Sequence, residues 1–221
     1  MLGQRIRLFI FEHFLESGVP PVVEKLMGEF TLSRDDVTQA LRDLETAHHI
    51  ALVPGTARIL LAFPFSAVAT PFRTTVGDRT YFANCAWDAI AFHAMLKRDI
   101  RVDSFCHHCA APVTVAVDGS TIDVEPREAL VYLALPPAQW WTEIVTTCSN
   151  TMVFFASPEH REASDLCASP SSAVSLTPQQ IDTLSEPIYP RKFALDYARP
   201  SREELLQHFA SMGLTGEYWR L

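Results

Sequence analysis

Two side chains that could do chemistry together lie in the segment Arg79–Lys97. Cys85 and Asp88 are three residues apart, directly after Asn84. Asn84 is of a type that often caps a helix, and the apolar residues that follow recur with roughly helical spacing. The sequence therefore predicts a helix entered just before Cys85. A cysteine in the first turn of a helix faces the positive end of the backbone dipole, which favours the thiolate over the thiol.

The spacing of this pair is compatible with catalysis. Side chains three residues apart lie on the same side of a helix, so the Asp88 carboxyl could exchange a proton with the Cys85 sulfur or with a group bound to it. A nucleophile and a proton carrier would then share one turn. The alternative is a buried cysteine beside an aspartate that only complements the helix dipole. For two such residues taken alone, this alternative is the commoner case.

A second cysteine pair, Cys106 and Cys109, encloses two histidines. A thioredoxin-like redox site needs this spacing at the start of a helix, whereas residues 110–117 have the pattern of a strand. A structural zinc site needs four ligands, and only the two cysteines and one of His107 or His108 are local. We therefore favour a turn with incidental thiols, keep zinc as the second interpretation, and rank the redox site last.

Cys148 precedes an apolar run, Thr151–Ala156, that is typical of a central strand. Taken alone, such a cysteine is most often a buried core thiol. The eight histidines of the chain form no His-Glu-x-x-His or similar motif, and there is no glycine-rich phosphate loop. Phosphoryl transfer and acyl transfer therefore have no support in the sequence.

The composition is that of a soluble globular protein. The chain has 221 residues, of which 48 % are hydrophobic, enough for one good core or two small ones. It has no run long enough to span a membrane and no signal-peptide pattern, so we expect a cytoplasmic protein with no membrane partner. A net charge of −8 disfavours nucleic acid as a partner.

The number of cysteines adds to this expectation. The sequence has five, at positions 85, 106, 109, 148 and 167. In a chain without an export signal, an odd number favours thiols for chemistry, for metal binding or for the core over a disulfide framework. We therefore expect Cys167, like the others, to be unpaired.

The N-terminal part of the chain predicts a small helical module. Helices are expected at residues 4–17, 22–27 and 33–47, followed by a hairpin at 50–62. Three helices and a hairpin are the winged helix-turn-helix pattern. The third helix carries many acidic side chains, which would repel phosphates, so we favour a structural or interaction role over DNA binding.

The remainder predicts strands with flanking helices. Strands are expected at 73–76, 80–82, 100–106, 112–117, 121–124, 129–135, 151–156 and 173–176. Helices are expected at 139–145, 160–167, from 177 and from 201 to 213, with a connector at 64–73 and a loop at 168–172. We assign an α+β fold with a winged-helix-like module at 1–64 and a mixed-sheet catalytic domain with a helical extension at 65–221.

Four short motifs follow one another along the chain. They are Asn84-Cys-Ala-Trp-Asp88, Arg101-Val-Asp-Ser-Phe-Cys106, Ala111-Pro-Val-Thr-Val115, and a cysteine shortly before Phe154-Phe-Ala-Ser157. In this order and spacing they resemble the alkylmercury (organomercurial) lyases. The resemblance covers about residues 25–190 and includes the winged-helix-like module, which that family also has. Four motifs in order are more specific than any one of them.

The resemblance implies protonolysis of carbon–mercury bonds. Hg(II) is a soft cation that prefers thiolate, so Cys85 and Cys148 would bind the mercury of R–Hg⁺. Asp88 would accept a thiol proton and deliver it to carbon, which releases R–H and leaves Hg²⁺ between the sulfurs. No cofactor is required. Low-molecular-weight thiols would carry the mercury away, and a mercuric reductase is the partner that the family suggests.

One departure from the family pattern concerns the second thiol. If Phe154-Phe-Ala-Ser157 is aligned without a gap, the second catalytic cysteine of the family falls on Ser149, whereas a one-residue insertion restores Cys148. In a strand, a slip of one residue turns a side chain to the opposite face. The mercury ligands would therefore be Cys85, Asp88 and either Cys148 or Ser149.

The other cysteines and the tail match less well. Cys106 falls on a family position that is usually considered structural, while Cys109 has no counterpart, and residues 197–221 extend beyond the match. Under the lyase hypothesis, replacing Cys85 or Asp88 by Ala should abolish turnover, whereas Cys109→Ala should be nearly silent.

Two further functions stay open. One is a relative with the same thiol pocket that binds a soft metal or cleaves another carbon–metal or carbon–heteroatom bond. The other is a metal-sensing winged-helix regulator, which a gel-shift assay with its own promoter would test.

Overall fold

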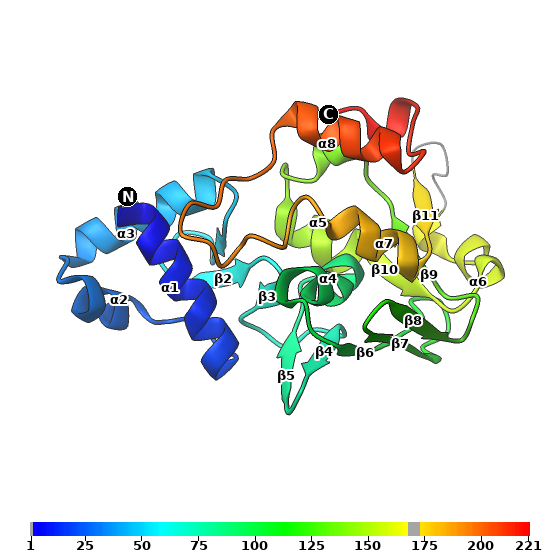
Figure 1. The fold of residues 1–221 in the computed structure, drawn as a ribbon, viewed down its shortest axis with the longest axis horizontal. Helices are drawn as coiled ribbons and strands as arrows, with labels where there is room; N and C mark the ends of the chain where they lie inside the picture. Colours follow the sequence, from blue (N-terminus) through cyan, green and yellow to red (C-terminus); the bar gives the residue numbers. More distant parts are fainter. Residues whose placement is uncertain (1, 168–172) are drawn as a thin grey trace.

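The computed structural model describes residues 2–167 and 173–221 of this chain as an α+β fold. Helices α1 (Leu2–Ser17), α2 (Val23–Phe30) and α3 (Arg34–Thr46) lie at one end, and the sheets and remaining helices form the rest (Figure 1). None of the described helices is long and apolar enough to cross a membrane. The loop predicted at 168–172 lies outside the described residues.

The first three helices lie close to their predicted positions. Ser33 caps α3 by accepting a hydrogen bond from the Asp36 backbone N–H, and the Asp36 side chain accepts from the Ser33 backbone in return. The predicted hairpin is a three-stranded sheet instead, with order β1 (Ala51–Leu52), β2 (Ile59–Ala62), β3 (Phe65–Ser66). Strand β3 was expected to be part of a connector, because prolines on both sides of such a short strand hide its pattern.

The central sheet has five strands in the order β5-β4-β6-β7-β8. Their bounds are β4 (Arg73–Val76), β5 (Arg79–Phe82), β6 (Ile100–Phe105), β7 (Pro112–Asp118) and β8 (Thr121–Glu125). Val113, Val115 and Val117 are buried while the residues between them are less so, as alternation predicts for a sheet with one covered face.

A smaller sheet has the order β10-β9-β11, formed by β9 (Leu130–Leu133), β10 (Met152–Phe155) and β11 (Val174–Leu176). Every residue of β9 and β10 is buried. All pairings within the described sheets are antiparallel. The mixed sheet that we expected is therefore wrong, because apolar runs such as Met152–Phe155 also occur in buried antiparallel strands.

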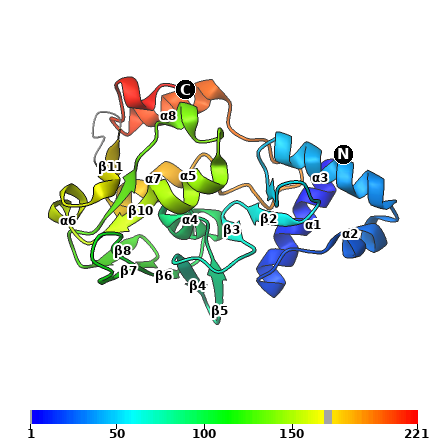
Figure 2. The same ribbon diagram turned by 180° about the vertical axis from the view of Figure 1, so that it is seen from behind.

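Helix α4 (Ala86–Leu96) is the centre of the larger part. Its residues Ala86 to Phe92 are all buried, and a helix that is hydrophobic all round must lie in the core. It packs between the strands and helix α7 (Pro178–Ser185). The Thr74 hydroxyl on β4 donates to the Ala89 carbonyl at 2.9 Å. Helix α4 thus lies among the other elements of this part of the chain, as Figure 2 shows from behind.

The segment before β10 differs most from the prediction. A short 3-10 helix, Pro137–Gln139, is followed by α5 (Ile144–Thr151), where we expected a helix at 139–145 and an extended entry to the strand. Two consecutive threonines and the polar run Ser149–Thr151 gave no helical signal. Helix α5 lies between α4 and α8 (Arg202–Ser211) in both views (Figures 1 and 2). Cys148 therefore belongs to a helix.

Helices also follow β10 and end the chain. Ser157 caps α6 (Pro158–Glu162) by accepting from the His160 backbone N–H, and a 3-10 turn at Asp165–Cys167 comes after it. The single helix predicted at 160–167 is thus a helix and a separate 3-10 turn. The helix begins earlier than predicted because Pro158 is favoured at the first helical position. The last helix, α8, is followed by a 3-10 turn at Glu217–Trp219.

Helix α1 is attached to the C-terminal part by a buried arginine. The Arg7 guanidinium is fully buried and donates to the backbone carbonyls of Lys192 and Ala194. Phe14 of α1 stacks on Phe65 with ring centroids 5.1 Å apart. A single core cluster runs through both parts of the chain.

We expect Arg7→Met to lower the free energy of unfolding by roughly 2–3 kcal/mol, because two buried carbonyls would lose charged donors. Urea denaturation followed by circular dichroism measures the change. Arg5→Met, on the exposed side of the same helix, is the matched control. Equal losses in the two variants would contradict the importance assigned to Arg7.

Candidate active site

Cys85 lies at the N-terminus of α4 and is itself the N-cap. Its Sγ accepts a hydrogen bond from the Asp88 backbone N–H at 3.3 Å. The predicted cap at Asn84 is therefore wrong by one residue. Asn84 instead donates from Nδ2 to the Asp88 carboxylate at 3.2 Å. The predicted proximity of Cys85 and Asp88 is present, since the Cys85 thiol donates to Asp88 Oδ2 at 3.4 Å.

The Asp88 carboxyl is buried and held on both oxygens. Tyr189, which follows α7, donates its hydroxyl to Oδ1 at 2.7 Å, while Asn84 and Cys85 occupy Oδ2. Burial raises the pKa of Asp88, although hydrogen bonds from Tyr189 and the positive charge of Lys192 act in the opposite direction. The carboxyl is therefore oriented, and its pKa lies above the ordinary value for aspartate.

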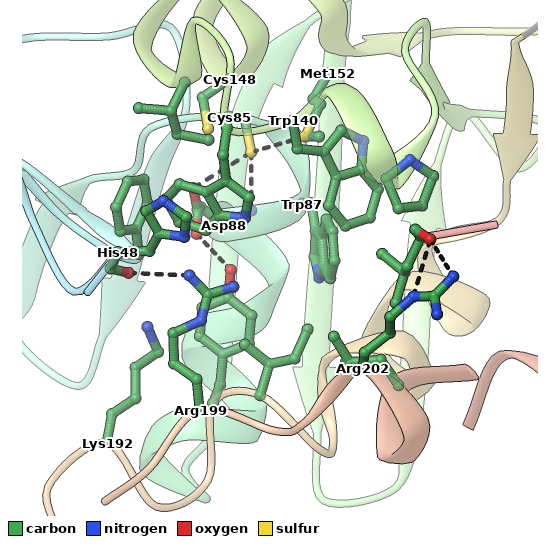
Figure 3. A pocket seen from close by; sticks show the side chains of 18 residues that line it. His48, Cys85, Trp87, Asp88, Trp140, Cys148, Met152, Lys192, Arg199 and Arg202 are labelled. Carbon is green, nitrogen blue, oxygen red and sulfur yellow. Dashed lines mark hydrogen bonds between the residues drawn. The ribbon is translucent and has the colours of Figure 1, made fainter. Parts of the chain in front are cut away.

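Cys148 reaches the same place from α5. Its sulfur, the Cys85 sulfur and a carboxylate oxygen of Asp88 all lie within 4.8 Å of one another, and Figure 3 shows the two sulfurs above Asp88. Met152 adds a thioether 3.9 Å from the Cys85 sulfur. Two thiols and a carboxylate at this separation are a donor set for one soft cation.

Ser149, the alternative to Cys148, is exposed. A slip of one residue reverses the face of a side chain only in a strand, and both residues lie in α5. In a helix, one residue rotates the side chain by about 100°, and this rotation puts Cys148 at 3 % exposure and Ser149 on the surface. Of the two residues, Cys148 is the one that lies beside Cys85 and Asp88.

The two thiols are protonated in the resting protein. Burial raises the pKa of Cys85 well above 9.0, and Cys148 and Asp88 raise it further. A hydrogen bond with Cys85 lowers the pKa of Cys148, but burial and Asp88 together raise it above its ordinary value. The expectation that the helix N-terminus makes Cys85 a thiolate is therefore wrong, since desolvation outweighs the backbone dipole.

An apolar cavity of about 320 Å³ opens above these groups. Its wall includes the aromatic side chains of Phe63, Trp87, Trp140 and Trp141. The indole N–H of Trp87 donates to Ser185 and that of Trp140 to the Leu135 carbonyl, each at 2.8 Å, so both rings are fixed and present only carbon to the cavity.

The C-terminal segment closes another side of the cavity with cations. Lys192, Arg199 and Arg202 line it together with Leu221, and Arg202 donates to the backbone oxygen of Leu221. Tyr189, Lys192 and Arg199 could not be predicted from the sequence, because they lie in an irregular segment without periodicity or motif.

Lys192 is buried among aromatic rings. It is 4 % exposed, and its Nζ lies 4.9 Å from the ring centroid of Tyr189. Burial, with the nearby Arg199, lowers the pKa of Lys192 to about 7, although Asp88 acts in the opposite direction. Its charge therefore changes near neutral pH, beside the carboxyl group of the site.

Cys106 and Cys109 do not line this cavity. They lie at the end of the β6–β7 hairpin, where both approach His160 of α6. His107 is turned away from them and contacts the ring of Phe155. The side chain of Cys167 lies outside what the structure describes.

An α+β protein with two buried thiols and a carboxyl group beneath an apolar cavity has the donor set of a thiol site for soft cations. The family model for alkylmercury lyase matches residues 65–189, more than half of the chain. This chain belongs to the alkylmercury lyase family.

Individual relatives agree with this assignment. The alkylmercury lyase of Streptomyces lividans is 30 % identical over 146 residues, which are 66 % of this chain and 65 % of the relative. That of Staphylococcus epidermidis is 27 % identical over 145 residues, 65 % of this chain and 64 % of the relative. That of Bacillus cereus is 32 % identical over 96 residues, 43 % of each chain. The matches thus span less than two thirds of the length of these curated relatives.

A solved structure shares the fold. The crystal structure of the mercury-bound form of MerB2 matches with a TM-score of 0.68 and 19 % identity, over 81 % of this chain and 86 % of that one. At this identity the match shows the fold alone.

The buried lysine predicts a pH dependence of stability. The pKa of Lys192 is about 7 in the folded protein and 10.5 in the unfolded chain. Between these two values the unfolded chain binds the proton more strongly, so the free energy of unfolding increases as the pH rises. Relative to Lys192→Met, the wild type should gain up to about 1.4 kcal/mol per pH unit between pH 7 and 9. Urea titrations across this range measure the difference.

The exposed residue Lys97 provides a control, because Lys97→Met removes an equal charge at the surface. If the stability difference between the wild type and Lys192→Met is the same at pH 7 and pH 9, the lysine is not held at a lowered pKa.

Proposed function

We propose that this protein cleaves the carbon–mercury bond of organomercurials, releasing the hydrocarbon and leaving Hg(II) bound to thiolates, as part of mercury detoxification. The observation that carries the proposal is the convergence of Cys85, Cys148 and Asp88 within 4.8 Å under an apolar cavity. Membership of the alkylmercury lyase family supports it. Cys85, Cys148 and Asp88 are the proposed catalytic residues and mercury ligands.

The first step is capture of R–Hg⁺ by sulfur. Metal binding displaces the proton from a thiol, and the first proton leaves to solvent as Cys85 or Cys148 forms a mercury–sulfur bond. The high pKa of both thiols is no barrier to a cation that binds thiolate as strongly as Hg(II) does. The cavity receives the organic group.

The second step places a proton beside carbon. The second thiol passes its proton to Asp88 over the 3.4 Å contact seen for Cys85, and its sulfur joins the mercury. Two thiolates increase the electron density on the bound carbon, which makes it basic enough to be protonated. Burial favours the protonated Asp88 carboxyl, and Tyr189 keeps it oriented.

The last step breaks the carbon–mercury bond. Asp88 gives its proton to carbon, so R–H leaves with the electron pair of the broken bond and Hg²⁺ stays between two thiolates. One of the two thiol protons ends on carbon and the other in solvent, and no electrons are gained or lost. The proposal thus needs no cofactor. Low-molecular-weight thiols would then remove Hg(II), and a mercuric reductase would be the partner that consumes it in the cytoplasm.

The N-terminal module at residues 1–64 has a proposed structural role as a winged-helix-like unit. Helix α1 bonds to the C-terminal segment through Arg7, and Tyr81 of β5 donates to the Leu15 carbonyl at 2.7 Å. The family match begins at residue 65, which supports the division into 1–64 and 65–221. The module thus holds the segment that carries Lys192 against the cavity.

Headspace detection of benzene from phenylmercury with excess thiol tests the reaction. We expect Asp88→Asn to lower kcat by about 100-fold or more, because the variant loses proton transfer, and Cys85→Ser to abolish turnover. Ser149→Ala, an exposed neighbour of Cys148, is the control and should keep wild-type activity. Unchanged turnover by Asp88→Asn would contradict the mechanism. Tight mercury binding without benzene from the wild type would favour a binding protein instead.

The aromatic wall predicts a preference for aryl groups. Trp141 is half-buried and lines the cavity, so Trp141→Ala should lower kcat/KM for phenylmercury by about 5- to 10-fold more than for methylmercury, from the loss of one aromatic contact. Product formation from both substrates measures the ratio. Phe105→Ala, at an exposed site outside the cavity, should leave that ratio unchanged, and a ratio unchanged in Trp141→Ala would place the organic group elsewhere.

A further inference from the structure

The Cys-His-His-Cys turn acquires a third donor in the folded protein. In the sequence, only the two cysteines and the histidines between them are close together, which is too few for the four ligands of a structural zinc site. In the structure, His160 of α6 lies with its Nδ1 3.6 Å from the Cys106 sulfur and 3.5 Å from the Cys109 sulfur. The three donor atoms lie within 4.8 Å of one another.

These separations match those around a tetrahedral zinc ion. Zinc binds sulfur at about 2.3 Å and imidazole nitrogen at about 2.0–2.1 Å, so the S···N edge of a tetrahedral site is about 3.6 Å. Both observed S···N distances agree with this edge. Relative to both sulfurs, the His160 nitrogen is therefore already at the distance that a shared zinc ion requires.

The backbone around the turn brings these side chains together. The Cys106 N–H donates to the Ala111 carbonyl at 2.8 Å, and the Ala110 N–H returns to the Cys106 carbonyl at 2.9 Å, which closes the turn. Ala110 has φ +59°, a left-handed conformation that is unfavourable for a residue with a side chain and that persists only where the surroundings enforce it. The His107 N–H donates to the Phe154 carbonyl of β10 at 2.9 Å, just before α6 begins.

Packing alone does not account for this cluster. Cys109 is exposed and His160 is half-buried, whereas a cysteine that serves only as a small apolar residue is usually buried. Two sulfurs and an imidazole nitrogen converge near the surface, where an ion has access.

We propose that Cys106, Cys109 and His160 bind a zinc ion that fastens the β6–β7 hairpin to α6. The fourth position falls to His108, whose ring centroid is 5.5 Å from that of His160, or to water. Zinc fits this donor set better than Hg(II), because imidazole with two thiolates in a tetrahedron is a common zinc arrangement. The site is separate from the candidate active site, since none of its ligands lines the cavity.

A structural consequence follows from the position of the site. The ion would join the hairpin end to the segment that continues from β10, the strand whose first residue is Met152. It would therefore stabilise the wall that carries Met152 next to Cys85.

The test is metal analysis of the full-length protein purified under reducing conditions, with cobalt(II) as a spectroscopic substitute. We expect about one zinc per chain, and cobalt-loaded protein with the visible bands of a tetrahedral ion and a sulfur-to-cobalt charge-transfer band. Cys109→Ser and His160→Ala should lose the metal and both signals. His107→Ala, in the same turn but facing Phe155, should retain them.

Two further variants keep the outcome unambiguous. His160→Cys should restore binding with a stronger charge-transfer band, because it supplies a third thiolate. Cys85→Ser with Cys148→Ser should keep the cobalt spectrum, since these cysteines belong to the other site. A wild type that takes up neither zinc nor cobalt would overturn the proposal. So would folded Cys109→Ser protein that still binds one equivalent, or a spectrum that disappears with Cys85 and Cys148.

Discussion

The desolvation of three acidic groups at the N-terminus of α4 is the interaction on which the proposed chemistry depends. Cys85, Cys148 and Asp88 are each at most 3 % exposed, and removing such groups from water disfavours their charged forms. The two thiols therefore hold their protons at rest, beside a carboxyl group whose raised pKa allows it to accept one. The proposed reaction must protonate carbon, and it can use these protons. When mercury binds the sulfurs it displaces the thiol protons, and one of them can pass to carbon through Asp88.

This desolvation requires the burial of α4. A helix with one polar face would leave its first turn at the surface, whereas α4 is apolar all round and is covered by strands and by α7. The Trp87 indole bonds to Ser185 at the end of α7, and Tyr189, a few residues on, reaches Asp88. The packing of one helix against another thus sets both the aromatic wall and the orientation of the carboxyl group.

The features that could be predicted from the sequence are those that depend on residues close together in the chain. The spacing of Cys85 and Asp88, the Ser33 cap and the alternating strands each depend on neighbours within a few residues. Features that tertiary structure decides could not be predicted. Tyr189 contacts Asp88 from an irregular segment, and His160 meets Cys106 from a separate helix. Polar residues around Cys148 also hid α5, because packing overrode weak helix propensity there.

The same residue types form the two proposed metal sites, and their surroundings suit different metals. In the cavity, thiols with raised pKa values and a wall of carbon exclude a cation that depends on water and on imidazole, and admit one that binds sulfur strongly and carries an apolar group. At the hairpin end, exposure and a histidine suit zinc. Each proposed site has two cysteines. The difference in metal preference would therefore come from burial and from the third donor, which is Asp88 in one site and His160 in the other.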